Sequence, residues 1–575
     1  MSYQLMFQKA VELQQNGALN EAEHIYRQIL ETAPDNADVL NLLGLIAQTR
    51  GIHNEAVNYF YKAAESAPHH FPIYFNLAVS LGALGKYMEA HEAYQKVLQL
   101  KPDCKEACFG IGNLYWQQNN LEAAAKAYRQ ALDIDSQYTE ARTNLYEIEN
   151  DIENLQKIAD GNPMALYYLG RRTFNDKDFT GAAAYLASAD KLTTDDEIKA
   201  MLGEALLQTG EPDTAHKLFL QAQNLNSQNL TAVLNLADMA AEKHQFGEAE
   251  KYYQRAIELD PRNLRAHANY ANMLCQSKRT LEALEQYRHA VIIAPQTPEL
   301  SYNLSLILKT LEEYEQALDL MFHAFYLAPT HDDWALNIAE TLITFYQKAP
   351  EKALKITENW YQKMPENIIV KHLWATLHQQ PSEVSKEYNT LLFNNFAATY
   401  EQTLGNIHYN VVAKIAELYA PMKGRILDLG CGTGLVAAAL KNNDNRFTGV
   451  DIAENMLAIA RQKNIYDTLL QTDILSYLQG NKQPFDVIIA ADVFCYFGDL
   501  QPILQACHPT RLIFSVEVEK EAEGYKIYPQ GRYKHNPEAI EKLLTACGYT
   551  QIQKHPLILR QENGVDVDGM IFEAV

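Results

Sequence analysis

A 34-residue spacing of alanines is the feature that most constrains how this chain can fold. Ala22, Ala56, Ala90 and Ala124 follow one another at this interval, and an aromatic residue stands four positions after each of them. A proline stands 12 positions after the first three. A period of this length predicts structural units that stack along the chain. The alanine pattern resumes further on, at Ala182, Ala215, Ala249, Ala283 and Ala317.

Each period predicts a pair of antiparallel helices. The alanine stands where the two helices approach closely, and the proline ends the second helix because it cannot donate a backbone hydrogen bond. A two-helix unit cannot bury its apolar face alone, so the copies must stack. Residues 3–370 resemble the tetratricopeptide-repeat (TPR) family, with about eleven units. Small residues at the eighth position of the units add to the resemblance: Gly44, Ala78, Gly112, Gly170, Ala237, Ala271 and Ala339.

One interval departs from the period. Ala124 and Ala182 are 58 residues apart, which fits one full repeat and one shortened repeat near 139–162. We therefore expect the superhelix to change its path there.

Asparagines recur at the sixth position of the first helix in six of the units. An amide side chain has donors and an acceptor, so a row of them could bind the backbone of an extended peptide without reading its side chains. The row resembles the asparagine ladder of O-linked N-acetylglucosamine transferase, and it predicts a protein or peptide substrate on the concave face. The alternative is that the amides only bridge neighbouring helices. The six are Asn76, Asn144, Asn235, Asn269, Asn303 and Asn337.

Composition restricts the partners that the chain can have. Lys and Arg total 49 against 72 Asp and Glu, a formal net charge of −23. This balance disfavours nucleic acid and anionic membranes and favours a basic partner. The seven cysteines form no metal-binding set, so we expect no metal site. Without a leader-like start or an apolar run long enough to span a membrane, the sequence predicts a cytoplasmic location. Its oligomeric state is left open.

Beyond about residue 380 the repeat gives way to β-rich runs that alternate with helical stretches. This alternation predicts a parallel sheet with helices on both faces, which binds ligands at the carboxyl ends of its strands. We therefore expect a multidomain chain, with an all-α TPR solenoid at 1–378 and an α/β Rossmann-like domain at 379–575. The expected strands are 425–429, 446–450, 486–490, 512–518, 551–559 and 569–575.

A glycine-rich turn in this part indicates a nucleotide site. Residues 426–434 read ILDLGCGTG, a buried strand followed by a turn that opens a helix. Glycines suit this turn because a Cβ would keep a flat ligand away from the backbone. A nicotinamide-binding turn would require another glycine at position 435, which is Leu. Asp451 ends the next expected strand, where its carboxylate can accept hydrogen bonds from both hydroxyls of a ribose.

These motifs resemble the class I S-adenosylmethionine-dependent methyltransferases over residues 385–575. The segments FAATYEQTL (396–404), ADVFCYFG (491–498) and GRYKH (531–535) also resemble bacterial TPR-containing predicted methyltransferases. The resemblance implies a seven-stranded Rossmann-like domain and S-adenosyl-L-methionine as the cofactor. After the fourth strand the chain departs from the usual Arg-Pro-Gly-Gly turn, which affects a peripheral loop.

The same resemblance implies roles for individual residues at the cofactor. Asp428 would orient the ammonium group, Asp451 would hold the ribose, and Asp473 would accept from the adenine amino group. Tyr400 would cover the cofactor, or serve only in packing. The other implied contacts are Gly430, Cys431, Gly432, Gly434, Ile452, Met456, Ile474 and Ala490.

The residues that act on the methyl acceptor are predicted at the end of the fourth strand and beyond the fifth. Asp492 would position or deprotonate the acceptor, and Tyr496 would orient it; alternatively, Asp492 contacts only the cofactor. Arg532, Tyr533 and His535 would bind the substrate; alternatively, Arg532 and His535 are only salt-bridged residues of their loop.

The sequence thus predicts a methyltransferase that acts on a protein or peptide presented by the repeats, with lysine as the first choice of acceptor. Two alternatives stay open. The chain could be a scaffold whose cofactor-binding domain performs no catalysis, or a small-molecule methyltransferase that docks on a partner through its repeats.

Overall fold

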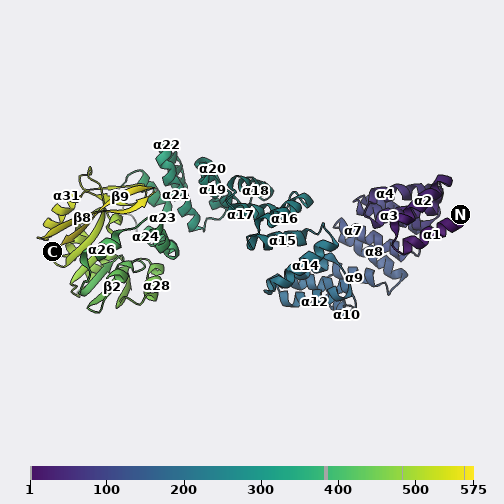
Figure 1. Ribbon diagram of the computed structural model, residues 1–575, viewed down its shortest axis with the longest axis horizontal. Helices are drawn as coiled ribbons and strands as arrows, with labels where there is room; N and C mark the ends of the chain where they lie inside the picture. Colours follow the sequence, from purple (N-terminus) through teal and green to yellow (C-terminus); the bar gives the residue numbers. More distant parts are fainter. Residues whose placement is uncertain (1–2, 381–385, 482, 563) are drawn as a thin grey trace. The chain divides into compact units, whose positions relative to one another are not determined.

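The computed structural model describes residues 3–380, 386–481, 483–562 and 564–575. Contacts within the chain divide it into two compact units, Met1–Pro261 and Arg262–Val575. The first unit is helical, and the second contains further helical pairs followed by an α/β domain (Figure 1). The predicted fold class, a TPR solenoid followed by a Rossmann-like domain, is confirmed.

The first unit is a succession of helical pairs. Consecutive helices pack against one another, as expected for stacked two-helix repeats. The helices are α1 (Tyr3–Gln15), α2 (Leu19–Thr32), α3 (Ala37–Thr49), α4 (His53–Ser66), α5 (Phe71–Ala83), α6 (Tyr87–Leu100), α7 (Lys105–Gln117), α8 (Leu121–Ile134), α9 (Thr139–Ile148), α10 (Ile152–Lys157), α11 (Pro163–Asn175), α12 (Phe179–Leu192), α13 (Asp196–Gln208), α14 (Pro212–Leu225), α15 (Leu230–Glu242) and α16 (Phe246–Leu259).

The pair α9 and α10 is the short one. These helices have 10 and 6 residues, whereas the second helix of the preceding pair, α8, has 14. Asn162, which follows α10, caps α11 by accepting a hydrogen bond from the Ala165 N–H, and its amide donates to the Thr143 hydroxyl. The side chain of Asn162 therefore ties the shortened pair to the next repeat.

The alanine and glycine positions of the repeats are sites of close helix approach. The period alanines Ala22, Ala56 and Ala90 are fully buried. At Gly112 in α7, a Cβ atom would lie 2.4 Å from a ring carbon of Tyr128 in α8. The ring of Tyr128, one of the aromatic residues of the 34-residue pattern, thus occupies the space that a side chain at position 112 would need.

A Gly112→Ala substitution is expected to destabilise this repeat by about 1–3 kcal/mol, because the added methyl group forces the Tyr128 ring to move in a packed core. Gly247→Ala is the matched control, since a Cβ there meets no atom within 4 Å. The control should be neutral or gain up to about 1 kcal/mol of helix stability. Hydrogen–deuterium exchange of the α7 and α8 amides measures the difference. Equal exchange rates in the two variants would contradict the packing argument.

The second unit begins with further helical pairs and continues with helices that precede the sheet. The paired helices are α17 (Leu264–Gln276), α18 (Thr280–Ile293), α19 (Pro298–Thr310), α20 (Tyr314–Leu327), α21 (Asp332–Lys348), α22 (Pro350–Lys363) and α23 (Ile368–Leu377). Then follow α24 (Lys386–Phe396), the 3-10 helix η1 (Ala397–Thr399), α25 (Tyr400–Asn406) and α26 (Val411–Tyr419).

The α/β domain is built on one sheet that has nine strands in the described part of the chain. They are β1 (Gly424–Leu429), β2 (Asn445–Asp451), β3 (Thr468–Gln471), β4 (Val487–Ala490), β5 (Arg511–Val518), β6 (Tyr525–Ile527), β7 (Tyr533–His535), β8 (Ile552–Glu562) and β9 (Val565–Ala574). The connecting helices are α27 (Leu435–Leu440), α28 (Glu454–Gln462), α29 (Ile474–Gly480), η2 (Phe494–Tyr496), α30 (Gln501–Cys507) and α31 (Pro537–Ala546).

The strand order explains why nine strands are found where seven were expected. Strands β3, β2, β1, β4 and β5 are parallel neighbours in that order. Strand β9 follows antiparallel to β5, and β8 pairs antiparallel with β9, so that β8 runs in the direction of β5. The last two residues of β5 extend beyond its pairing with β4 and pair with β7, which forms a hairpin with β6. This hairpin is the addition to the seven-stranded arrangement.

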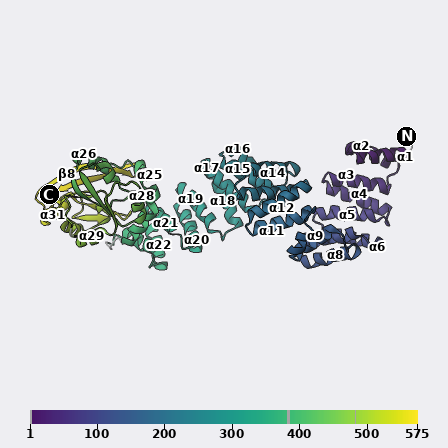
Figure 2. The same ribbon diagram turned by 90° about the horizontal axis from the view of Figure 1, so that it is seen from below.

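Alternating side chains of the strands face two separate cores. Leu427, Ile488 and Leu512 pack with α29, α30 and α31, whereas Ile426, Ile489 and Ile513 pack with α26 and α27. Figure 2 shows α26 and α29 on opposite sides of the sheet. Helices on both faces leave the carboxyl ends of the parallel strands as the place where a ligand can bind.

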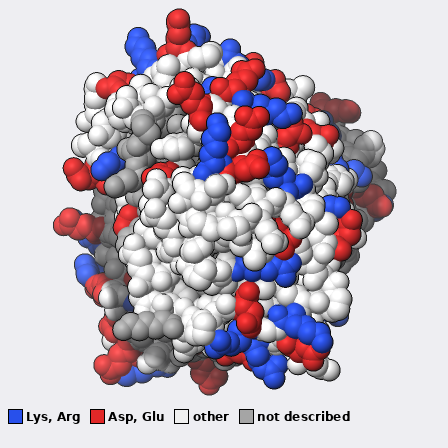
Figure 3. Space-filling model, turned by 90° about the vertical axis from the view of Figure 1, so that its left-hand side faces the viewer, with Lys and Arg blue, Asp and Glu red and all other residues white. Residues whose placement is uncertain are grey.

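The surface of the domain carries charges of both signs. Figure 3 shows Lys, Arg, Asp and Glu side chains around an uncharged area on the face that it presents. The acidic excess of the chain is thus not gathered into one patch on this face. Within the described segments, no helix combines the length and apolar character needed to cross a membrane.

Candidate functional site

A cavity of about 280 Å³ lies at the carboxyl ends of β1, β2 and β4. Helix α24 and the residue that opens α25 contribute to its wall, so the cavity is closed by parts of the chain that precede the sheet. The lining residues are Asn389, Phe393, Tyr400, Gly430, Gly432, Asp451, Ile452, Met456, Thr472, Asp473, Ile474, Leu475, Ala491, Asp492, Val493, Tyr496 and Phe497.

The three glycines of the turn after β1 have positive φ angles, a conformation that favours glycine. A Cβ at Gly430 would lie 2.4 Å from a methyl carbon of Val493. A Cβ at Gly432 would have only a Tyr400 ring carbon within 4 Å, at 3.8 Å, so this glycine leaves open space against the backbone. Gly434 lies outside the cavity lining, and a Cβ there would approach Tyr466 to 2.9 Å.

The Asp451 carboxylate lies at the end of β2 and lines the cavity. One oxygen accepts a hydrogen bond from the Gly432 N–H at 2.8 Å, and the other accepts from the Ala453 N–H at 2.9 Å. Burial raises the pKa of Asp451, and the backbone N–H groups lower it in part. Each oxygen keeps a second lone pair for a ligand, so the carboxylate can accept from two adjacent hydroxyls.

Four of the residues that were predicted to contact the cofactor lie outside the cavity lining. Asp428 is 1% exposed, and its carboxyl accepts a hydrogen bond from the Tyr466 hydroxyl at 2.7 Å. Burial raises the pKa of Asp428 to about 7. Cys431, Gly434 and Ala490 are also absent from the lining. A direct contact of these four residues with a cofactor therefore stays a prediction to which the geometry adds no support.

The other predicted cofactor residues come together in the cavity. Ile452 and Met456 pack with Tyr400 in one apolar cluster, and Ile474 lines the same cavity. Asp473 caps α29 by accepting a hydrogen bond from the Ser476 N–H, and it also lines the cavity. The β2 and β3 ends thus present an apolar wall with two carboxylates.

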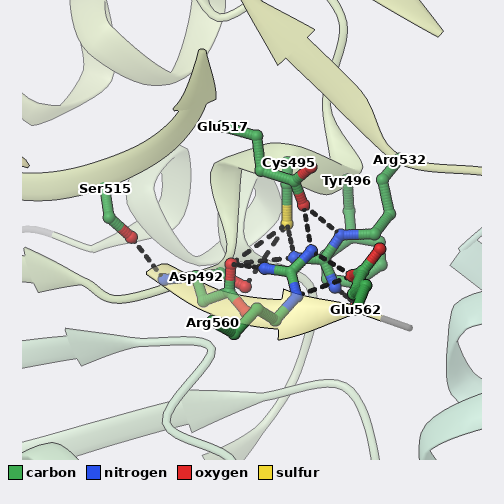
Figure 4. A network of polar contacts seen from close by, with 8 residues as sticks. All are labelled: Asp492, Cys495, Tyr496, Ser515, Glu517, Arg532, Arg560 and Glu562. Carbon is green, nitrogen blue, oxygen red and sulfur yellow. Dashed lines mark hydrogen bonds and ion pairs between the residues drawn. The ribbon is translucent and has the colours of Figure 1, made fainter. Parts of the chain in front are cut away.

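A buried network of ion pairs holds Asp492 (Figure 4). Arg532 donates to Asp492 at 2.8 Å and to Glu517, and Arg560 contacts Glu517 at 2.6 Å and Asp492 at 3.5 Å. Cys495 lies between these groups, within hydrogen-bonding distance of Arg532 and Asp492. Asp492, Cys495 and Glu517 lie close enough together to hold a metal ion, but the two guanidinium groups already bind the ligand atoms of these three residues.

The network weighs against Asp492 as a base. Burial by itself would raise the pKa of Asp492, but Arg532 and Arg560 outweigh it and hold this pKa below its usual value. A carboxylate with a lowered pKa is a poor proton acceptor. Tyr496 lines the cavity, and its hydroxyl accepts a hydrogen bond from Arg532 at 3.3 Å while its ring lies under the guanidinium. The geometry therefore suits Tyr496 and Asp492 for orientation of an acceptor.

Two of the predicted substrate contacts are packed inside the domain. Tyr533 and His535 are 5% and 2% exposed, and neither lines the cavity. His535 contacts the Gly498 carbonyl, and burial lowers its pKa to about 4, so it is neutral at pH 7. Arg532 also lies outside the lining, although it binds the lining residues Asp492 and Tyr496. A direct substrate contact by these three residues stays a prediction.

Asparagines of the first unit form hydrogen bonds between neighbouring repeats. The Asn76 amide donates to the carbonyl oxygen of Asn41 at 3.1 Å. Asn144 donates to Asn113 at 3.3 Å and accepts from the Tyr168 hydroxyl at 3.0 Å. Each partner is more than 20 residues away in the chain, so these amides bridge successive helical pairs.

Two more of the predicted asparagines, Asn235 and Asn337, also bind neighbouring helices. Asn235 is 4% exposed and donates to Glu204 at 3.1 Å, and Asn337 donates to the Tyr302 hydroxyl at 2.6 Å. Bridging of helices, the alternative that the sequence left open, thus describes these amides and those of Asn76 and Asn144. Binding of a peptide by the six asparagines stays a prediction. The other two are the half-buried Asn269 and Asn303.

Several residues at the site were not predicted. Arg560 meets Glu517 across 43 residues of chain, and no local spacing in the sequence signals this pair. Asn389 and Phe393 come from α24, which no repeat or strand pattern predicted. Their four-residue spacing on one helix is a signal that could have placed them on the same face.

The comparisons with known proteins agree with this architecture. A family model described as "Methyltransferase domain" matches residues 427–511, and models described as "Tetratricopeptide repeat" match residues 7–70, 75–139, 200–263 and 240–307. The chain combines tetratricopeptide repeats with a methyltransferase domain. The matched methyltransferase residues contain the glycine turn, Asp451, Asp473 and Asp492, so most of the cavity lining lies within them, whereas Asn389, Phe393 and Tyr400 precede them.

Curated relatives named as methyltransferases match a quarter of this chain or less. The Bacillus subtilis protein "Putative methyltransferase YqeM" is 38% identical over 118 residues, which are 20% of this chain and 48% of that protein. A Vibrio cholerae protein named "Ubiquinone biosynthesis O-methyltransferase" is 23% identical over 172 residues, 25% of this chain and 70% of that protein. The chain thus spans about half the length of the first of these relatives.

Part of the chain is also similar to a solved structure. A tetratricopeptide repeat protein from Parabacteroides merdae is 20% identical, with a TM-score of 0.35, over 39% of this chain and 93% of that chain.

Proposed function

We propose that the methyltransferase domain binds S-adenosylmethionine in the cavity and transfers its methyl group to a protein or peptide acceptor. The observation that carries the donor assignment is the Asp451 carboxylate, which faces the cavity with both oxygens oriented by backbone N–H groups. A ribose diol is the ligand group that fits two such oxygens. The open space at Gly432 lets the sugar approach the backbone.

The lining beside Asp451 fits an adenosine. Ile452, Met456 and Ile474 offer apolar surface to a purine, and Asp473 lies beside them. When bound, S-adenosylmethionine supplies a methyl group on a sulfonium centre, which leaves by in-line displacement. The chain contributes alignment, which corresponds to an effective molarity of roughly 10⁵–10⁸ M for well-oriented reactions.

The β4 end of the cavity is the proposed place of transfer. Asp492, Tyr496 and Phe497 line it, and Arg532 holds the first two from behind. Because Asp492 is neutralised by two guanidinium groups, it contributes little attraction for an ammonium ion. Lysine therefore remains a sequence-based choice of acceptor that the electrostatics of the site does not favour.

A protein or peptide acceptor is supported by the repeats. TPR units suggest protein–protein interaction, and α23, the last helix before residue 378, ends at Leu377. We place the functional boundary at 378/379, so that the repeats bind the partner and residues 379–575 perform the chemistry. A second candidate is a small-molecule acceptor, favoured by the name of the Vibrio cholerae relative. The two candidates share the donor site.

Labelled methyl transfer tests this function. The full chain is incubated with methyl-labelled S-adenosylmethionine and a cell lysate, and calorimetry measures the affinity for the unlabelled donor. Label in a protein band supports the first candidate, and label only in soluble small molecules supports the second. Donor binding without any transfer would support the alternative of a scaffold that performs no catalysis. The absence of donor binding would reject the proposal.

Gly430→Ala is expected to weaken donor binding about tenfold, because a left-handed backbone costs an alanine about 1–2 kcal/mol and its Cβ would press on Val493. Gly480→Ala at the end of α29 is the control, since a Cβ there meets no atom within 4 Å. Calorimetric titration with S-adenosylmethionine measures both variants. Unchanged affinity in Gly430→Ala would show that the turn tolerates a side chain.

A further inference from the structure

The last helix of the repeats packs against the turn that carries Arg532. Helix α23 contributes His372, and the turn between β6 and β7 (residues 528–532) contributes Gly531, which is buried and has a φ of +76°. A Cβ atom at Gly531 would lie 2.4 Å from Nε2 of His372 and 2.9 Å from its Cε1. Glycine therefore lets this turn approach the imidazole more closely than any other residue would.

A second ring fixes the imidazole from the side of α24. His372 stacks on Tyr388 of α24, with ring centroids 3.6 Å apart and an interplanar angle of 11°. Tyr388 is 9% exposed and belongs to the same core cluster as Leu373 and Leu377 of α23. Burial lowers the pKa of His372 to about 4, so its ring is neutral at pH 7 and makes these contacts by packing.

Backbone hydrogen bonds close the turn that faces His372. The Gly531 N–H donates to the Tyr528 carbonyl at 2.8 Å, and the Tyr528 N–H donates to the Arg532 carbonyl at 2.9 Å. Because Gly531 and Arg532 are consecutive in this closed turn, a displacement of the Gly531 backbone also moves the backbone of Arg532. The contact with His372 therefore fixes the point from which the Arg532 side chain starts.

The guanidinium group of Arg532 reaches the end of the cavity where we place methyl transfer. It donates to the Asp492 carboxylate at 2.8 Å and to the Tyr496 hydroxyl at 3.3 Å, and it lies 5.2 Å from the centre of the Tyr496 ring (Figure 4). Asp492 and Tyr496 both line the cavity. A series of contacts thus connects the last repeat helix, through Gly531 and Arg532, with two side chains at the β4 end.

Resting on the proposed function, we infer that His372 is a positioning residue for methyl transfer: its imidazole holds the Gly531 turn so that Arg532 keeps Asp492 and Tyr496 oriented toward the acceptor. His372 lies on the repeat side of the 378/379 boundary. The last repeat therefore contributes to the transfer step in addition to the binding of a partner.

The donor end of the cavity has supports of its own. The Asp451 carboxylate is held by the backbone N–H groups of Gly432 and Ala453. Two hydrogen bonds of 3.0 Å between Asn394 and Asn455 join α24 to α28. These bonds involve neither α23 nor the turn between β6 and β7, so loss of the His372 ring should leave donor binding intact.

Three variants and a control test the inference in the full chain. His372→Ala removes the ring that faces Gly531, Gly531→Ala places a methyl group against that ring, and the third variant combines the two substitutions. His378→Ala is the matched control, because His378 follows the same helix but contacts Trp374 and Glu358 within the repeats. The readouts are the calorimetric affinity for S-adenosylmethionine, and the maximal rate and donor KM of labelled methyl transfer into a dilute cell lysate.

We expect His372→Ala to lower the maximal rate about 3- to 30-fold, because a misplacement of about 1 Å at the reacting groups can cost about 100-fold. Its donor KM and donor affinity should stay within about twofold of wild type, as for a residue that acts only on transfer. Gly531→Ala should also slow transfer. The double variant should lose less than the product of the two single losses, because the added methyl group no longer meets an imidazole. His378→Ala should match wild type.

Three outcomes would overturn the inference: an unchanged maximal rate in His372→Ala, a parallel loss of donor affinity in that variant, or a double variant whose loss equals the product of the single losses. The first would make His372 irrelevant to transfer, and the second would make it a general support of the cavity. The third would mean that His372 and Gly531 act independently. If wild type itself failed to bind the donor, the proposed function would be rejected instead. Donor binding without transfer by wild type would reject both.

Discussion

Asp451→Ala is expected to reduce the affinity for S-adenosylmethionine by at least about 100-fold. The variant would lose the two charge-assisted hydrogen bonds that the carboxylate accepts from the ribose, each worth about 1.5–3 kcal/mol. It would also release the Gly432 and Ala453 N–H groups, so the glycine turn would lose its support at the same time. Calorimetric titration of the full chain with the donor and with its demethylated product measures the loss.

Asp451→Asn separates the two effects. An amide keeps one acceptor oxygen but places an NH₂ group against one of the two backbone N–H donors. We expect it to bind more weakly than wild type as well. Asp444→Ala is the control, because the Asp444 side chain is 61% exposed and its ion pair within the described part of the chain is with the exposed Lys423. If Asp451→Ala bound the donor as wild type does, the ribose assignment would be wrong.

Arg560→Met is expected to destabilise the methyltransferase domain by about 3–5 kcal/mol, the usual cost when one partner of a buried ion pair is removed. The Arg560 side chain is 2% exposed and contacts Glu517, Glu562 and Asp492. Without it, Glu517 would keep only Arg532 as a cationic partner in the network. Hydrogen–deuterium exchange of the β5 and β9 amides in the full chain reports the free energy of opening of this sheet.

Lys554→Met provides the comparison on the same strand. Lys554 pairs with Glu541 at 2.6 Å, but the two side chains are 37% and 44% exposed. Exposed pairs contribute less than about 1 kcal/mol, so exchange in this variant should remain close to wild type. Equal destabilisation by the two substitutions would show that burial of the network adds nothing to its strength.

The part of the cavity lining at the ends of β1 and β2 could be predicted because its residues are close in sequence. The turn at 426–434 and Asp451 lie at the ends of adjacent strands, so their spacing along the chain already places them at one sheet edge. The cavity contains Gly430, Gly432, Asp451, Asp473 and neighbours as expected. Asp428 shows the limit of this reasoning, because the sequence did not reveal that Tyr466 binds its carboxyl.

The acceptor half was less predictable, since it depends on contacts between distant segments. Asp492 was expected to position or deprotonate the acceptor, or to contact only the cofactor, and the sequence did not reveal that Arg532 and Arg560 form ion pairs with it. Tyr533 and His535 were expected at the substrate and are packed inside the domain. A motif shows which side chains are adjacent in the chain, but not toward which neighbour each of them turns.

The sequence by itself determined the two architectures. A 34-residue period can be satisfied only by stacked helical pairs, and strand–helix alternation with a glycine turn leads to a parallel sheet, because both follow from local spacing. Only the tertiary structure decided which side chains meet. It joined α24 to the cavity and paired Arg560 with Glu517, because these contacts depend on packing between segments that local spacing does not relate.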